Sequence, residues 1–125
     1  MNTDNFGIGK REIKFRAWDD LMKNMHTEFQ KEKFFTEKME DPKNWEDCIL
    51  TQYTGLLDKH GKEIYEGDIT SLHYGVVTFD EGSFGIEYKD RFDEATSCEL
   101  IFQNKHVEVI GNVFEDRHLL KNDIK

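Results

Sequence analysis

The sequence has few cysteines and one proline, and it contains no long apolar run. Its cysteines, Cys48 and Cys98, are too far apart to form a CxxC ligand pair, and two do not make a disulfide framework. No apolar stretch approaches the roughly 18 residues of a membrane helix, and the first residues lack the apolar core of a signal peptide. We therefore expect a cytoplasmic protein that is neither secreted nor membrane-spanning.

The sequence also has fewer basic than acidic residues. Lysine and arginine number 17 against 26 aspartates and glutamates, which gives a net charge of −9. A surface of this sign repels phosphate backbones and anionic lipid. We therefore expect neither duplex nucleic acid nor a membrane as a partner.

What the chain does contain is aromatic and charged. Hydrophobic residues make up 37% of its 125 residues, charged residues 34%, and ten residues are phenylalanine. This length suits one domain that buries about two-thirds of its unfolded surface. We expect a flexible leader over residues 1–9 and a single domain over 10–125. Within it, residues 10–50 would hold N-terminal strands and an acidic loop, and 51–118 a barrel-like β-meander.

The most regular passage runs from Gln52 to Ile69, QYTGLLDKHGKEIYEGDI. Two clusters of turn-forming residues divide it into three short extended segments. Gly61 closes the first turn because glycine adopts positive φ easily, while Asp58 can bond its own backbone two residues on. Gly67 then precedes a strand that begins near Ile69.

Residues before this passage alternate over 10–18, which predicts a strand with Ile13, Phe15 and Ala17 facing the core. The next apolar residues are ambiguous. Either Asp20 caps a helix over about 21–33, or two strands meet at a turn near 23–24. Residues 36–47 read as a surface loop or a short acidic helix.

Residues after the passage indicate a chain of hairpins. Strands are expected at 69–73, 76–79, 84–88, 98–103 and 106–114, separated by a turn at 74–75, a tight turn at 80–83 and a polar excursion at 89–97. Gly82 suits a positive φ, Gly111 suggests a bulge, and Leu119 and Leu120 mark a short C-terminal helix. The fold class is thus mainly β with minor α. We expect a small curled meander or SH3-like, partly open barrel, with an additional N-terminal β-hairpin region.

One strand face carries the chain's best candidates for ligand binding. Lys14, Arg16 and Trp18 alternate on it, so two cations could hold a phosphate while the indole stacks a base. Arg11 and Tyr53 could complete such a pocket. The structural alternative is that the cations form surface ion pairs and Trp18 is a wall of the core.

A second candidate lies in the acidic loop, where Trp45 is either an anchor into the core or an exposed contact for a partner protein.

Signals for catalysis are weak. The five histidines are isolated and neither cysteine lies beside one, so we expect no metal site. Nucleophile-elbow, P-loop, dinucleotide-binding and HExxH motifs are missing. The sequence predicts no cofactor and no enzymatic activity.

Four blocks of the sequence resemble the YopX family of phage and prophage proteins. They are KFRAWD at 14–19, GLLDKHGKEIYEGDI at 55–69, GVVTFDEG at 75–82 and EVIGNVFEDRHLL at 108–120. The resemblance implies a mostly β phage accessory protein with no established catalytic residues, and a short hairpin after Trp18. Residues 22–48 carry no family pattern.

Three binding functions follow as hypotheses. The first is counter-defence in the host cytoplasm by sequestering a small anionic, nucleotide-type host signal. The second is an adaptor or inhibitor that binds a host protein through its acidic surface, and the third is a barrel that binds single-stranded nucleic acid. Exposed strand edges also lead us to expect a homo-oligomer.

Overall fold

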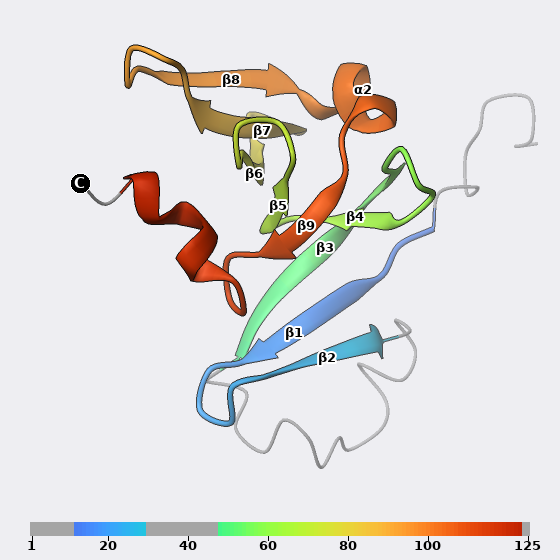
Figure 1. Cartoon of the computed structure of the whole chain (residues 1–125). Helices are drawn as coiled ribbons and strands as arrows, with labels where there is room; N and C mark the ends of the chain where they lie inside the picture. Colours follow the sequence, from blue (N-terminus) through green and yellow to red (C-terminus); the bar gives the residue numbers. More distant parts are fainter. Residues whose placement is uncertain (1–11, 30–47, 124–125) are drawn as a thin grey trace, which may run out of the picture. The chain divides into compact units, whose positions relative to one another are not determined.

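The computed structural model describes residues 12–29 and 48–123, and its fold is mainly β with short helical segments, as predicted (Figure 1). One four-stranded sheet has the order β2-β1-β3-β4, and one five-stranded sheet has the order β8-β7-β6-β5-β9. The strands are β1 (Phe15–Asp19), β2 (Asn24–Phe29), β3 (Cys48–Leu57), β4 (Glu63–Tyr65), β5 (Asp68–Thr70), β6 (Val76–Asp80), β7 (Ser83–Lys89), β8 (Ala95–Glu99) and β9 (Val109–Asn112). The helical segments are α2 (Leu100–Gln103), η3 (Asn104–His106) and η4 (Arg117–Asp123).

The chain divides into two compact units, residues 1–55 and 56–125, and each is described by itself. The expected leader and the acidic loop with Trp45 lie outside the described residues. No helix in the described ranges is long and apolar enough to cross a membrane.

In the first unit, β1 and β2 form an antiparallel hairpin in which Asp19 pairs with Asn24. The Asp19 carboxylate accepts hydrogen bonds from the backbone N–H groups of Leu21 and Met22, each at 3.0 Å. These hydrogen bonds stabilise a turn at this point instead of the start of a helix. The predicted hairpin is confirmed for this part of the chain, and the alternative helix is wrong over its described residues, 21–29.

The burial of β1 differs from its predicted pattern. Ala17 is fully buried as expected, but Arg16 and Trp18 on the opposite face are also buried, at 8% and 5% exposure. Ile13 is 44% exposed, so its expected place in the core is wrong. It lies before β1 begins at Phe15, and among the described residues it is paired in neither ladder of that strand.

In the second unit, the first turn has the predicted geometry. The backbone N–H of His60 donates to Asp58 Oδ1 at 2.8 Å, and that of Gly61 donates to the Asp58 carbonyl at 3.0 Å. Gly61 and Gly67 have φ of 81° and 90°, which glycine adopts without steric cost. The three predicted extended segments correspond to β3, β4 and β5.

The five-stranded sheet follows as a meander around one apolar core. Strands β6 and β7 pair from Val76 with Glu87 to Asp80 with Ser83, as the predicted tight turn requires. The turn at Tyr74-Gly75 is also confirmed, because the Gly75 N–H bonds to the Leu72 carbonyl at 2.8 Å. The fully or nearly fully buried core residues are Ile64, Val77, Ile86, Leu100, Val107 and Val109.

The predicted strand over 98–103 is wrong beyond Glu99. Strand β8 begins earlier, at Ala95, and pairs with β7 until Glu99 lies opposite Gly85. The chain then enters α2, where Leu100 turns into the core while Ile101 and Phe102 face solvent. Three consecutive apolar residues read as a strand, but only the first is buried.

The last predicted strand is shorter than expected. It spans β9 alone, and its pairing with β5 slips between Gly111 and Val109, which is the irregularity that Gly111 suggested. The predicted C-terminal helix is present as the 3-10 segment η4.

Candidate functional site

The basic strand face predicted to bind a ligand lies in the first unit and brings Lys14 and Tyr53 together. The Lys14 ammonium lies 5.0 Å from the centre of the Tyr53 ring, and it also forms an ion pair with Glu12 at 3.2 Å. The Tyr53 N–H donates to the Lys14 carbonyl at 2.9 Å, which fixes the register of the two segments. Arg11 lies outside the described residues.

The other members of this face are enclosed by the protein. Arg16 Nε donates to Thr51 Oγ1 at 3.3 Å, and Trp18 Nε1 donates to Asp20 Oδ1 at 3.2 Å. The Lys23 side chain, followed by the Trp18 indole, lowers the pKa of Asp20. Both predicted ligand contacts, Arg16 and Trp18, therefore have protein partners and little exposed surface.

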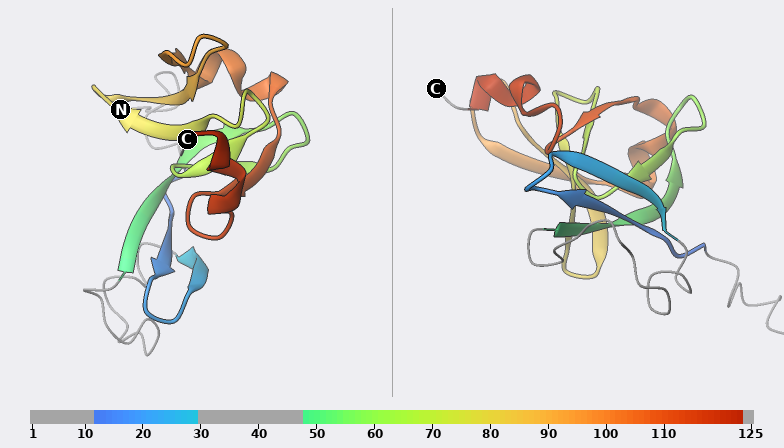
Figure 2. Two further views of the ribbon diagram at one scale, coloured as in Figure 1. Left: turned by 60° about the vertical axis from the view of Figure 1, so that its left-hand side comes forward. Right: turned by 90° about the horizontal axis from the view of Figure 1, so that it is seen from below.

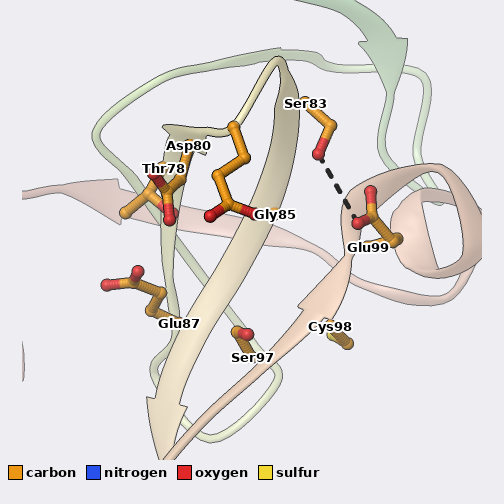
Figure 3. A pocket seen from close by; sticks show the side chains of 9 residues that line it. Thr78, Asp80, Ser83, Gly85, Glu87, Ser97, Cys98 and Glu99 are labelled. Atoms are coloured by element: carbon orange, nitrogen blue, oxygen red, sulfur yellow. Dashed lines mark hydrogen bonds between the residues drawn. The ribbon is translucent and has the colours of Figure 1, made fainter.

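A second arrangement, which the sequence did not reveal, lies on the outer face of the β6, β7 and β8 meander. A hollow of about 340 Å³ opens there (Figure 3). Cross-strand pairing places Thr78, Gly85 and Glu99 in one row, because Gly85 lies opposite both of the others. Side chains alternate along each strand, so Val77, Ile86 and Cys98 form the corresponding row on the other face.

The hollow has a floor of small residues and a rim of acids. Its small residues are Thr78, Ser83, Gly85 and Ser97, and its acids are Asp80, Glu81, Glu87 and Glu99. Gly85 has no side chain to fill the hollow. A Cβ at this position would lie 3.0 Å from the Cys98 carbonyl oxygen, which is a tight contact. Figure 3 shows labelled lining residues on all three strands, and the Ser83 hydroxyl donates a long hydrogen bond of 3.5 Å to Glu99.

The rim acids have no cation beside them in the described part of the chain. Within residues 12–29 and 48–123, none of the four carboxylates forms an ion pair, and the hollow is lined by no lysine or arginine. Like charges gathered around a concave surface raise the local concentration of cations. The hollow can therefore attract a cationic group, although no cluster in the described part of the chain is arranged to hold a metal ion.

Cys98 also lines the hollow, although its side chain belongs to the row on the other face of the sheet. Burial, followed by the negative charge of Glu99, raises the pKa of this thiol. Since the thiolate is the reactive form of cysteine, Cys98 is poorly suited to nucleophilic chemistry at neutral pH.

A second hollow, of about 290 Å³, lies elsewhere on the same unit. It is lined by His73, Tyr74, Lys89, Asp90, Asp93, Leu119 and Leu120. His73 also stacks on Tyr88, with ring centres 5.0 Å apart. The lining of this second hollow mixes charged, aromatic and aliphatic residues, so it favours no single class of ligand.

Sequence reasoning missed the acidic hollow because its members come together only through strand register. Asp80 and Glu81 read as solvated turn acids, and the predicted strand over 98–103 begins later than β8, so it leaves Ser97 outside the sheet. The available signal was the alternation of polar residues Thr78 and Asp80 with apolar Val77 and Phe79 along β6.

Comparisons with known proteins agree with the family resemblance. The family model described as YopX protein matches residues 14–121. Among solved structures, protein EF1440 from Enterococcus faecalis is similar, with a TM-score of 0.55 and 24% identity over 87% of this chain and 98% of that chain. At this identity the likeness concerns the fold alone. The search of curated proteins found no match.

Proposed function

Because this chain belongs to the YopX family and is a phage-type protein, we propose that it acts by binding a partner protein rather than by catalysis. In this proposal, a cationic segment of a host protein docks on the acidic hollow formed by β6, β7 and β8. The chain would then be an adaptor or inhibitor, which is the second of the three hypotheses drawn from the sequence.

The unpaired acidic rim is the observation that carries this proposal. Four carboxylates surround a hollow with a floor of small polar residues, and no described lysine or arginine neutralises them. Repulsion among the acids raises the electrostatic free energy of this surface, and a bound cationic partner lowers it. The same charges also speed association with that partner. The shape of the hollow accepts lysine or arginine side chains, because Gly85 and Ser97 leave room above the sheet.

Sequestration of an anionic nucleotide is the weaker proposal. It needs Arg16 and Trp18 to face a ligand, yet both are more than nine-tenths buried and bonded to Thr51 and Asp20. Of the predicted group within the described residues, Lys14 retains the most exposed side chain, at 21%. One cation already paired with Glu12 is a poor basis for holding a phosphate.

Binding of a labelled cationic peptide, measured by fluorescence anisotropy at low salt, tests the proposal. The probe is a heptapeptide of alternating lysine and valine, and an alternating glutamate and valine peptide of the same length is its negative control. We expect the cationic peptide to bind and the anionic one not to. The double variant Glu87→Gln/Glu99→Gln should weaken binding by roughly fivefold, the effect of two charge pairs at the exposed-pair magnitude.

The matched control is Glu108→Gln/Glu115→Gln, which changes net charge equally in the same unit but away from the hollow. It should change the affinity less than about twofold, by our estimate of general charge effects. Equal weakening by both double variants would mean that only the overall charge of −9 attracts the peptide, and the proposed site would be rejected.

A further inference from the structure

The five-stranded sheet has two edges, and the described structure treats them differently. At the β9 edge, carboxylates occupy backbone donors: Asp58 Oδ2 accepts from the Val109 N–H at 2.9 Å, and Asp116 Oδ2 accepts from the Asn112 N–H at 3.0 Å. The Lys59 N–H also bonds to the Val107 carbonyl at 2.9 Å, just before β9 begins. These contacts close that edge to another strand.

The opposite edge is β8, which pairs with β7 on one side only. Among the described residues, no backbone group of 95–98 forms a backbone hydrogen bond outside its pairing with β7. Figure 1 shows β8 as the outer strand of this unit, and Figure 2 shows β8 and α2 (orange) beside the β6–β7 hairpin (yellow) from two other directions. An open edge of this kind is the template for strand addition.

The acidic hollow borders this edge, because β8 supplies part of its lining. Glu99 and Ser97 belong to β8 itself and lie opposite Gly85 and Glu87. A strand added beside β8 would place every second side chain next to Ser97 and Glu99 on the outer face, about 5 Å away across the sheet. Lysine or arginine at those positions would meet the rim acids.

Apolar contacts are available where β8 ends. Helix α2 follows directly, and its Ile101 and Phe102 side chains are 62% and 73% exposed. Large exposed apolar residues beside an open strand are typical of protein-binding surfaces. They would meet an apolar residue at one end of the added strand.

We propose that β8 takes up an extended cationic segment of the partner protein as an added antiparallel or parallel strand. This rests on the proposed function and adds the mode of recognition: backbone hydrogen bonds to β8 give affinity, and the acids select alternating cationic side chains. A second copy of this chain is a poor occupant, because pairing two β8 edges would place a second acidic rim, and no cations, beside Glu99.

Two cationic peptides of equal charge distinguish strand addition from charge attraction. The first is the alternating lysine and valine heptapeptide, and the second replaces each valine with proline, which removes backbone donors and cannot pair fully as a strand. Binding is measured by anisotropy on the full chain, and amide hydrogen exchange is followed with each peptide. We expect the valine peptide to bind about tenfold more tightly, the equivalent of a net hydrogen bond or two. The amides of 95–98 should gain protection, and those of β9 should not.

Each other outcome overturns a defined part of the proposal. Equal binding of both peptides without protection of β8 rejects strand addition but leaves the acidic docking site standing. Failure of both peptides to bind rejects the proposed function as well. If the free chain dimerises in sedimentation experiments and β8 amides gain protection with protein concentration, a second copy occupies the edge and the proposed occupant is wrong.

Discussion

Asp58 shows how one side chain can join distant parts of a fold. Its carboxylate accepts hydrogen bonds from the backbone N–H groups of His60, Lys62 and Val109 at 2.8, 2.9 and 2.9 Å. The first two bonds shape the turn between β3 and β4, and the third holds the start of β9. Buried at 5% exposure, this acid stabilises the second unit as an ion bonded to neutral donors.

The protonation of Asp58 should therefore affect stability. Burial raises the pKa of this carboxyl, but the backbone donors of Val109, Lys62 and His60 together outweigh burial and hold the pKa below its ordinary value of 3.8. A depressed pKa in the folded state means that the stabilisation is present above the unfolded pKa of about 3.9. It is lost as pH falls through the folded pKa.

The Asp58→Asn substitution tests this account. An asparagine side chain has one acceptor oxygen, so at least one buried N–H loses its partner, and we expect a loss of about 2 kcal/mol in unfolding free energy at neutral pH. Urea unfolding followed by circular dichroism, from neutral pH down to about pH 3, measures it. The difference from the unsubstituted chain should shrink toward the acidic end. The exposed Asp80→Asn control should change stability by no more than about 0.5 kcal/mol, and an equal loss there would contradict the assignment.

The same residue marks the limit of sequence reasoning. The bond to His60 lies two residues away, so the local pattern of aspartate and glycine predicted it. The bond to Val109 spans 51 positions and depends on how β9 pairs with β5, which no local pattern contains. The Arg16 bond to Thr51 is missed for the same reason, and a group that alternation marked as an outward-facing site is instead enclosed.

Among the strands and turns, the turn of the β6–β7 hairpin contains a residue that does not suit its backbone conformation. Glu81 and Gly82 are the two residues between the paired Asp80 and Ser83, and their φ values are 50° and 84°. A two-residue turn with both φ angles positive is a type I′ turn, in which asparagine followed by glycine is preferred. Gly82 adopts a positive φ without steric cost, but at Glu81 the Cβ makes a positive φ unfavourable.

Substitution of Glu81 by asparagine should therefore stabilise the hairpin. We expect a gain of about 0.5–1 kcal/mol, because asparagine tolerates the left-handed conformation better than glutamate. Glu81→Gln is the matched control, since it removes the same charge without favouring positive φ. Urea unfolding of both variants at neutral pH gives the comparison. If Glu81→Gln stabilised the chain equally, relief of charge repulsion at the acidic rim would explain the gain instead of turn geometry.

Elements were predictable where periodicity and turn chemistry agreed. Strands β6 and β7 follow this rule, because alternating residues flank a turn with glycine. Around Cys98 to Gln103 the apolar run indicated a strand, yet the chain leaves the sheet after Glu99 and coils into α2. The apolar run did not reveal this, since Leu100 is buried in the core while Ile101 and Phe102 are exposed in α2.

Across the chain as a whole, the second unit stands out because it contains its own apolar core. The core residues lie between Ile64 and Val109, and the partly buried residues packed against them are Leu56, Leu72, Phe84, Tyr88 and Cys98. The acidic hollow and the β8 edge belong to the same unit. Core and proposed binding surface can therefore be tested together on one fragment.

We expect the fragment of residues 56–125 to fold without the first unit. Its core is complete, and the pairing of β5 with β9 closes the unit between distant segments. Urea unfolding followed by circular dichroism should give one cooperative transition, and the lysine and valine peptide should bind with the affinity that it has for the full chain. Ile86→Ala in the fragment should lower stability by about 2–5 kcal/mol or abolish folding, because Ile86 is fully buried. A fragment without a cooperative transition would mean that the first unit is needed for folding. A folded fragment that no longer binds the peptide would instead place part of the binding surface within residues 1–55, where neither the hollow nor β8 lies.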